Sequence, residues 1–434
     1  MGIADINSTL KDVVSKVVQV INSFGYGITS YGFRERLPIV NLRGKKIAFD
    51  FSIILNAKMI TAHNEIIAKM VNITQAYDRK ILQRKTFEAI IAFFVQIISE
   101  GITPVIVFDG QTHELKKSTV AERHEKKQEK IKHVQELTNS YLSTMAFDRT
   151  EGMMNELRDA MKNMIRIQKE DIMIMWDIFE KLGIRCLTAP HDAEKLCASL
   201  SREGIVSAVY GNDTDNYPLG TSILITKIYH EGGIGLVYDC VNMEEIMYCL
   251  TQYCGWKDYQ GNQIPFTLDN LVDLCILHGC DFNERMKEPT KRGNNLKSVG
   301  AKGALNKIVQ FRKFENFPIN LYPFMSCLNI YDCRLLFSYV ASNETQESTN
   351  INWNFFSRNK QDIFDCYDLK PYIRIAASKI DKTVLHLKNT QDKIIEEDTT
   401  NIQNLSMNKL NNQISTNVQK CDDNRNISYS GYVL

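Results

Sequence analysis

The chain has 434 residues, of which 44% are hydrophobic and 24% are charged. These values are typical of a globular protein, and the length allows one large domain with additions or two domains. The net charge is only +1. The molecule as a whole therefore has no polybasic character, and any contact with nucleic acid must depend on local patches of charge.

The composition predicts neither export nor a membrane anchor. Residues 1–6 lack the basic and apolar regions of a signal peptide, and Ile6 stands where a myristoylation signal needs Ser or Thr. No apolar run approaches the ~18 residues of a membrane span. The eleven cysteines are scattered through apolar segments, which indicates reduced thiols inside a cell.

Four of the cysteines form two C-x4-C pairs, Cys249 with Cys254 and Cys275 with Cys280. A zinc site is one interpretation of this spacing. The other is that these thiols belong to the core, which we favour because Cys275 falls inside an apolar helical pattern.

The first 110 residues predict helices that alternate with strands, as in a parallel sheet with right-handed crossovers. Both strands end in an aspartate, Asp50 and Asp109. In such sheets ligands bind beyond the carboxyl ends of the strands. In chain order we expect a helix at 6–21, a glycine-broken loop at 25–32, a strand at 45–50, a helix at 52–59, a polar segment up to 85, a helix at 87–98 and a strand at 104–109.

A charged segment follows, and residues 116–133 hold seven Lys or Arg against three Glu. Such a run is commonly a solvated helix. Because it begins seven residues beyond Asp109, phosphate binding is an equally good interpretation. Four cations fall near one face of the expected helix: Lys116, Arg123, Lys127 and Lys130.

Residues 140–168 predict an extended or helical insertion, which is followed by a helix at 175–182. Both ends of the stretch between Asp109 and that helix return to the same sheet. We therefore expect the basic segment to rise over the strand ends as an arch. A cationic arch of this kind would admit a single strand of nucleic acid but not a duplex.

Residues 190–215 are the stretch around which the rest of the chain is organised. A helix begins at residues 192–194 and ends before Gly204, and a buried strand at 205–210 runs into Gly211. Carboxylates at strand and helix ends repel one another unless a cation lies between them. We therefore predict a divalent metal site formed by six carboxylates: Asp50, Asp109, Asp192, Glu194, Asp213 and Asp215.

The remaining sequence predicts a hairpin of strands at 223–228 and 232–238, and a helix over 267–278. A basic loop, 285–297, precedes a glycine turn that opens a helix at 300. Such a turn offers backbone N–H groups to a phosphate. After 313 the pattern weakens: 321–340 is apolar, 341–350 is a polar linker, 353–380 is a candidate packed unit, and 388–427, with thirteen Asn or Gln in forty residues, predicts disorder.

Taken in order, these motifs resemble those of the structure-specific 5′-nucleases of the flap-endonuclease and xeroderma-pigmentosum-G family. The resemblance implies an α/β fold with a central, mostly parallel, twisted sheet flanked by helices (PIN-like), a helical arch and a helix–two-turn–helix DNA-binding element. It extends over about residues 1–312. The motifs are Met1–Ile3, Ala48–Asp50, Pro104–Gly110, Leu115-Lys116 with Arg123, Ala189–Glu194, Asp213–Asp215, Val272–Asp281 and Gly300–Lys302.

The same resemblance assigns roles to individual residues. Asp281 joins the six carboxylates as a ligand of two Mg²⁺ ions, for which Mn²⁺ would substitute. Lys116 and Arg123 would act as catalytic residues on the scissile phosphate. The expected DNA contacts are Gly2, Lys127, Lys130, Gly300 and Lys302.

The implied function is two-metal hydrolysis of branched double-stranded DNA that carries a 5′ single strand. The products would be a 5′-phosphate and a 3′-hydroxyl, and the enzyme would act as a monomer in the nucleus, in replication, repair or recombination. Two alternatives are weaker. A phosphatase of the haloacid-dehalogenase type needs a second aspartate where Ser52 stands, and an idle DNA-binding scaffold gains nothing from seven carboxylates that repel one another.

The chain also departs from the family pattern. Asp192 stands where Glu is usual, Asn56 where an aromatic residue is common, and the loop between Asp281 and Gly300 is long, which puts a monovalent-cation site in doubt. The tail shows no sliding-clamp motif. These features are similar to those of divergent members carried by large DNA viruses. We expect a nuclease domain at 1–312 (regions 1–137 and 172–312 around an insertion at 138–171), an extension at 313–386 and a tail at 387–434.

Overall fold

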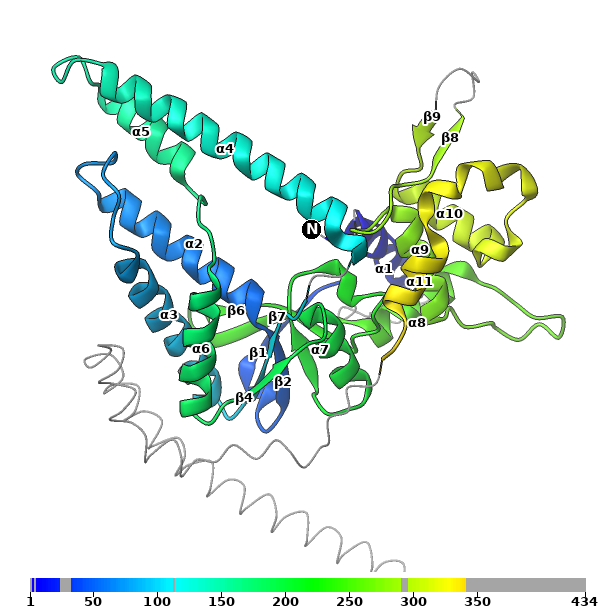
Figure 1. The fold of residues 1–434 in the computed structure, drawn as a ribbon. Helices are drawn as coiled ribbons and strands as arrows, with labels where there is room; N and C mark the ends of the chain where they lie inside the picture. The colour runs from blue at the N-terminus through cyan, green and yellow to red at the C-terminus, as the bar shows by residue number, and fades with distance from the viewer. Residues whose placement is uncertain (1, 4, 24–32, 112–113, 290–295, 341–434) are drawn as a thin grey trace, which may run out of the picture. The chain divides into compact units, whose positions relative to one another are not determined.

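The computed structural model describes residues 2–340, apart from residues 4, 24–32, 112–113 and 290–295 (Figure 1). Over these residues the chain forms an α/β fold around a seven-stranded sheet with the order β1-β7-β6-β5-β2-β3-β4. The predicted fold class is thereby confirmed. The expected loop at 25–32, the candidate packed unit at 353–380 and the tail at 387–434 lie outside the described residues.

The strands at the centre of the sheet run parallel, and the strands on the side of β1 pair in antiparallel fashion. β2 pairs in parallel with both β3 and β5, and β6 extends this parallel set before β7 and β1 add antiparallel strands. Strands covered on both faces appear in a sequence as continuous apolar runs, which is why β2 and β3 could be predicted. The strands are β1 (Glu35–Pro38), β2 (Lys46–Asp50), β3 (Thr103–Phe108), β4 (Arg185–Thr188), β5 (Ala208–Tyr210), β6 (Ile223–Glu231) and β7 (Gly235–Asn242).

Successive side chains of β2 point to opposite faces of the sheet. Because most of these side chains are apolar, helices pack on both faces. On one face, the ring of Phe49 packs against Phe94, with 5.2 Å between ring centroids. On the other, Ala48 belongs to the large core formed with α1, α7 and α9. The helices are α1 (Ile6–Ser23), α2 (Phe51–Lys69), α3 (Arg79–Ser99), α6 (Lys169–Lys181), α7 (Ala193–Arg202), α8 (Met243–Cys254), α9 (Leu268–His278), α10 (Ala301–Phe311) and α11 (Ile330–Phe337).

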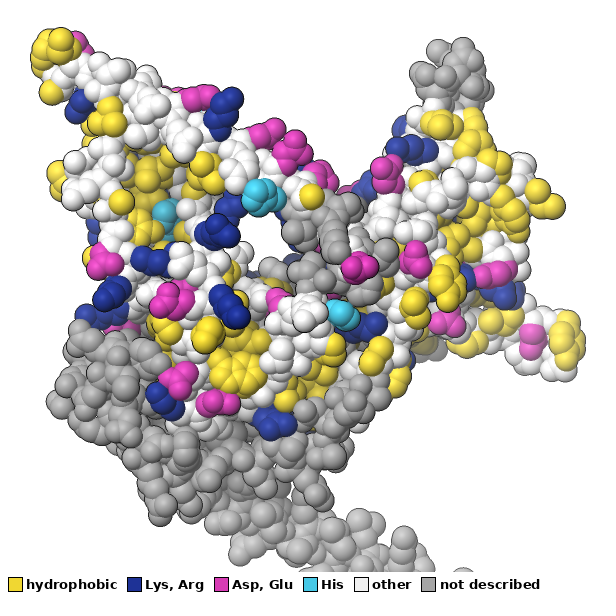
Figure 2. Space-filling model, in the orientation of Figure 1, with side chains coloured by type: hydrophobic (Ala, Val, Ile, Leu, Met, Phe, Trp, Pro, Cys, Tyr) yellow, Lys and Arg dark blue, Asp and Glu magenta, His cyan; other side chains and the backbone are white. Residues whose placement is uncertain are grey.

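The predicted insertion is a helical hairpin of α4 (Lys117–Ser143) and α5 (Glu151–Met161), which follows the short 3₁₀ helix η2 (Glu114–Lys116). α4 leaves the sheet near the ends of its strands, and α5 returns beside it (Figure 1). The far end of the hairpin is fastened to α2 by a small apolar cluster that includes Ile67, Ile73 and Leu157. The space-filling view shows an opening below α4 with Lys and Arg side chains on its border (Figure 2).

Several boundaries differ from the sequence prediction. The helix expected to end at 59 continues to Lys69, and α3 begins at Arg79, inside the segment expected to be polar and irregular. The end of α2 was missed because the buried polar side chain of His63 interrupts its apolar pattern. The start of α3 was missed because its capping residue, Asp78, stands in a polar stretch without an apolar pattern. β1, β4 and α8 were not predicted, since β1 and β4 have only four residues each and β1 alternates in burial.

The C-terminal part of the described chain is more structured than its sequence suggests. The basic loop at 285–297 contains a two-stranded hairpin, β8 (Lys287–Pro289) with β9 (Leu296–Ser298). After α10 the chain forms three short 3₁₀ helices and then α11, whose Cys333 and Phe337 join the main core. Besides η2, the 3₁₀ helices of the described residues are η1 (Ile39–Leu42), η3 (Thr214–Asn216), η4 (Phe314–Asn316), η5 (Ile319–Phe324) and η6 (Ser326–Leu328).

Candidate functional site

Three adjacent strands place aspartates at the carboxyl ends of the strands, on one rim of the sheet. Asp50 ends β2 and Asp109 follows β3, while Asp213 comes shortly after β5. Asp50 accepts a hydrogen bond from the Ser52 backbone N–H (3.0 Å) and so caps α2. Asp109 accepts hydrogen bonds from the Ser52 hydroxyl and from the Ala193 backbone N–H (2.8 Å). These bonds fix the orientation of both carboxylates, because the donors belong to helix starts packed on the sheet.

Glu194, Asp213 and Asp215 form a close acidic trio. One carboxylate oxygen of each lies within 4.8 Å of the other two. Glu194 comes from the first turn of α7, whereas the two aspartates lie at the start of η3. Asp215 is only 3% exposed, and its Oδ1 is buried with no hydrogen-bond partner among the described residues. A buried oxygen of this kind requires an explanation, and a bound cation is one that fits.

Burial and repulsion raise the pKa of three carboxyl groups at this edge. Burial, followed by the charges of Asp213 and Asp215, raises the pKa of Glu194 well above its usual range. Burial and then Asp213 raise the pKa of Asp215 to about 8, and burial and then Asp109 raise the pKa of Asp50 to about 7. Each pKa unit is worth about 1.4 kcal/mol. A divalent cation would relieve this repulsion, and a donor set made only of oxygens suits Mg²⁺ or Ca²⁺.

Two glycines near the site allow segments of the chain to approach each other closely. Gly2 has a φ of +57°, and a Cβ on it would lie 1.9 Å from Asp213 Oδ1. A Cβ on Gly110 would lie 2.0 Å from the Ala189 carbonyl oxygen. Neither position accepts a side chain. Gly2, which we expect to contact DNA, lies buried against Asp213 and Thr214 and thus beside the acidic groups.

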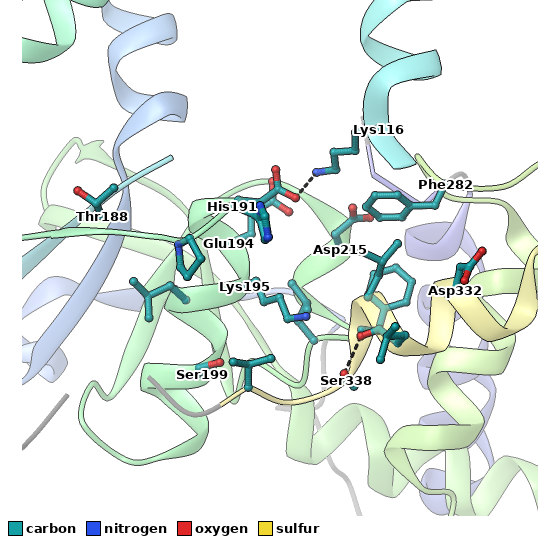
Figure 3. A pocket seen from close by; sticks show the side chains of 18 of the residues that line it. Lys116, Thr188, His191, Glu194, Lys195, Ser199, Asp215, Phe282, Asp332 and Ser338 are labelled. Atoms are coloured by element: carbon teal, nitrogen blue, oxygen red, sulfur yellow. Dashed lines mark hydrogen bonds and ion pairs between the residues drawn. The ribbon is translucent and has the colours of Figure 1, made fainter. Parts of the chain in front are cut away.

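Lys116 stands at the base of α4, directly over the site (Figure 3). Its Nζ lies 2.8 Å from Asp192 Oδ2 and 5.2 Å from the centre of the Phe282 ring. Burial alone would lower the pKa of Lys116, but the charges of Glu194, Asp192 and Asp215 outweigh it and raise the pKa above its usual range. The amine therefore stays protonated and faces the acidic groups as a cation.

The next turn of α4 is tied to Asp281, the residue expected to be the seventh ligand. Arg123 forms an ion pair with the Asp281 carboxylate, and the Thr119 hydroxyl donates to the Asp281 carbonyl oxygen (2.6 Å). Asp281 lies just beyond α9 and its charge acts on Asp215. We call the carboxylates of Asp50, Asp109, Asp192, Glu194, Asp213, Asp215 and Asp281 the acidic rim.

The remaining predicted DNA contacts lie away from the acidic rim. The Lys127 amine donates to the Ile165 carbonyl oxygen (2.7 Å), so it links α4 to the segment that returns from α5. Lys130 is exposed farther along α4. Gly300 caps α10, and Lys302 is exposed in the first turn of that helix.

The alternative zinc site has no support among the described residues. The acidic trio is the one group of three or more His, Cys, Asp or Glu side chains in the described chain with metal-ligand spacing. Cys249 and Cys275 are buried in the main core, as the interpretation of these thiols as core residues requires.

Sequence reasoning missed several residues at the site. Ser52 and Thr119 support Asp109 and Asp281, and Phe282 lies beneath the Lys116 amine. Each is an ordinary residue type, and its role depends on contacts between distant segments. The one available signal was position: Ser52 and Phe282 each stand within two residues of a predicted ligand.

Comparison with known proteins defines the class to which this fold and site belong. Residues 28–130 match the XPG N-terminal domain and residues 183–281 match the XPG I-region. The first region contains Asp50, Asp109 and the base of α4, and the second contains the acidic trio and Asp281. Both regions in which the chain matches the flap-endonuclease and xeroderma-pigmentosum-G family therefore contain its candidate site residues.

Individual relatives are distant. Flap endonuclease 1 of Plasmodium falciparum is 25% identical over 325 residues, which are 74% of this chain and 45% of that protein. Flap endonuclease 1 of Aedes aegypti is 25% identical over 283 residues, 65% of this chain and 63% of that protein. The chain thus spans about half the length of the Plasmodium relatives. The solved flap endonuclease-1 from Methanococcus jannaschii covers 82% of this chain and is itself 97% covered, with 16% identity and a TM-score of 0.49.

Proposed function

We propose that this chain is a divalent-metal-dependent 5′ endonuclease that cleaves branched DNA with a free 5′ single strand. The observation that carries the proposal is the acidic trio of Glu194, Asp213 and Asp215, which faces the protonated amine of Lys116. The two XPG regions and the name of the relatives, flap endonuclease 1, support the same activity.

We infer that the acidic rim holds two Mg²⁺ ions, for which Mn²⁺ would substitute. Three observations support a metal: the buried Oδ1 of Asp215, the raised pKa values of Asp50, Glu194 and Asp215, and ligand atoms that are all oxygen. When bound, such ions supply a water nucleophile near neutral pH and stabilise the leaving oxygen. The expected products are a 5′-phosphate and a 3′-hydroxyl.

Lys116 and Arg123 are the groups proposed to act on the scissile phosphate. Each is paired with a rim carboxylate, Asp192 for Lys116 and Asp281 for Arg123. A phosphate bound at the rim would offer both cations a second anionic partner. Their N–H groups would then stabilise the charge that develops on the phosphate oxygens. The aromatic face of Phe282 would hold the Lys116 amine over the site as this happens.

Substrate choice is proposed to depend on the shape of the DNA. α4 starts beside the acidic rim, and its Lys127 is bonded to the returning segment at Ile165, so the chain encloses an opening next to the rim (Figure 2). We propose that the 5′ single strand passes through this opening, which lies under a basic helix. Lys130, Gly300 and Lys302 would contact the phosphates of duplex DNA held outside, with little regard to base sequence.

The proposed setting is DNA replication, repair or recombination, with the protein acting as a monomer in the nucleus or at the replication site of a DNA virus. This setting rests on the family resemblance. No helix in the described part of the chain is both long enough and apolar enough to cross a bilayer.

The decisive experiment compares three DNA substrates in the presence and absence of Mg²⁺: a 5′ flap, the same flap whose 5′ end is blocked by a bulky protein before the enzyme is added, and a plain duplex. We expect Mg²⁺-dependent cleavage near the junction of the free flap, and little cleavage of the other two. Equal cleavage of all three would contradict shape selection and leave a general nuclease. No cleavage of any of them would favour the DNA-binding scaffold.

A further inference from the structure

A cavity of about 230 Å³ lies between α2, α3 and β6, on the face of the sheet that carries Phe49. Its lining includes Tyr210 at the end of β5, and the Tyr210 ring packs against Phe49 with 5.3 Å between ring centroids. Asn212, also in the lining, directly precedes Asp213, so the cavity borders the acidic rim. No carboxylate of the acidic rim lines it, and the proposed cleavage chemistry does not use it.

The cavity contains a cation that has no anionic partner in the described part of the chain. Lys58 comes from α2, and its amine lies 5.3 Å from the centre of the Phe93 ring on α3. Lys58 forms neither an ion pair nor a hydrogen bond with a described residue, and no described Asp or Glu lines the cavity. Burial lowers the pKa of Lys58, and no charge of a described residue opposes it. A partly buried charge of this kind is costly unless an anion joins it.

Two further hydrogen-bond donors accompany the Lys58 amine. The Tyr210 phenol and the Asn212 side-chain amide line the cavity, and neither forms a hydrogen bond with another described residue. The hydroxyls of Thr61 and Thr226, by contrast, already donate to backbone carbonyl oxygens. The lining therefore offers an ammonium, a phenol and an amide to a ligand that accepts hydrogen bonds.

The size, charge and position of the cavity indicate the class of ligand. Its volume is below the roughly 300 Å³ at which pockets for drug-sized ligands begin, so one anionic group fits better than a whole nucleotide. A phosphate group presents several oxygens to the three donors, and charge strengthens each of these hydrogen bonds. The cavity also lies at the carboxyl ends of the strands, where sheets of this kind bind their ligands.

We propose that Lys58, Tyr210 and Asn212 form a binding site for a phosphate group, separate from the metal site at the acidic rim. The phosphate is either free inorganic phosphate or part of a DNA strand, since both present the same oxygens. Only the second source rests on the proposed nuclease function. A DNA phosphate held here would be one that is not cleaved, and it would fix the DNA beside the acidic rim.

Free phosphate is tested through the melting temperature of the full-length protein without divalent metal. The melting temperature is compared in phosphate buffer and in sodium chloride of equal ionic strength. Wild type should melt a few degrees higher in phosphate, because a ligand that binds only the folded state stabilises it. Lys58→Met, which keeps an apolar side chain on the Phe93 ring, should lose this shift. Lys69→Met, at an exposed position of the same helix, is the control and should keep it.

DNA is tested with flap substrates in which single phosphates are replaced, one at a time, by neutral methylphosphonates. Affinity is measured without divalent metal. At one phosphate other than the scissile one, the replacement should weaken binding to wild type about tenfold, as expected for one charged hydrogen bond. Lys58→Met should bind intact DNA about tenfold more weakly and be insensitive to that replacement, because the lost contact is the same. Tyr210→Phe, which removes one donor and keeps the ring, should show a smaller loss and serves if Lys58→Met does not fold.

The two measurements identify the occupant of the site. A phosphate-induced shift that is lost in Lys58→Met supports free phosphate, and a methylphosphonate effect that is lost in Lys58→Met supports DNA. If neither effect depends on Lys58, the proposal is overturned. Because neither measurement requires cleavage, the nuclease function is judged separately. Cleavage of flaps while both effects are missing would refute the phosphate site alone, and either effect without cleavage would support the site and contradict the nuclease.

Discussion

The acidic rim and the basic helix α4 face each other, yet they are built in different ways. The rim carboxylates sit at the ends of buried strands and at helix starts, and Asp50 and Asp215 are almost wholly covered. α4 has few buried contacts along its first half, and its cations are held by pairs with Asp192, Asp281 and the Ile165 carbonyl. The rim is fixed by the core, whereas the cations depend on partners that a substrate can replace.

This difference separates two kinds of effect. A change in the rim alters groups whose positions are set by the sheet, so it should act on the chemical step. A substitution near the base of α4 should lower the cleavage rate, whereas one farther along the helix should weaken DNA affinity. The reason is that the distance from the rim increases by about 1.5 Å per residue of helix.

The largest effect is expected from the rim. Asp213→Asn and Asp109→Asn should each lower the single-turnover cleavage rate at least about 100-fold, since even partners one step removed from a metal are worth 10–100-fold. DNA affinity measured without cleavage should persist. Asp12→Asn, an exposed position on α1, is the control. A variant that retains the full rate would remove its residue from the ligand set.

A smaller effect is expected at the base of α4. Lys116→Ala and Arg123→Ala should slow single-turnover cleavage about 10- to 100-fold, in line with one charged hydrogen bond, and weaken binding less. Lys116 should matter more, because its side chain is 13% exposed against 45% for Arg123. Lys132→Ala, on the opposite face of the helix, is the control. Recovery of the full rate at saturating DNA would make both residues ordinary electrostatic contacts.

The repulsion among the rim carboxylates should also affect the stability of the folded protein. The pKa of Asp215 is raised in the folded protein to about 8. The stability of the metal-free protein should therefore fall as the pH rises from about 4 to about 8, because the folded state binds the proton more tightly. Asp215→Asn, which cannot ionise, should raise the melting temperature of the metal-free protein at pH 8 by a few degrees. It should also reduce the stabilisation by Mg²⁺. A lower melting temperature without metal would contradict the repulsion described here.

The smallest effect is expected farther along α4. Lys130→Ala should weaken DNA binding slightly and reduce the slope of log affinity against log salt by about 0.9, which corresponds to one phosphate contact. The cleavage rate at saturating DNA should not change. The exposed Lys132→Ala again serves as the control. A loss of rate at saturation would extend the catalytic part of α4 beyond its first turns.

The positions of the carboxylates were predictable because their signal is local. Asp50 and Asp109 each follow a continuous apolar strand, and Asp192 with Glu194 opens an amphipathic helix. The sequence also predicted the basic helix and its one-sided cations. It did not predict the length of α2, where buried His63 breaks the apolar period, nor β4, which is too short to show a pattern.

The sequence by itself determined which residue types stand at the strand ends, since the period of a buried strand and the turn after it are properties of neighbouring residues. Only the tertiary structure decided which of them meet. Glu194 joins Asp213 and Asp215 through the packing of α7 on the sheet, and Phe282 meets Lys116 and Phe337 from three separate elements. The apolar pattern of residues 321–340 is visible in the sequence, but the position of α11 depends on contacts of Arg334 with Asp273 on α9 and of Phe337 with Phe282. Contacts between distant segments depend on the whole core, and no local pattern encodes them.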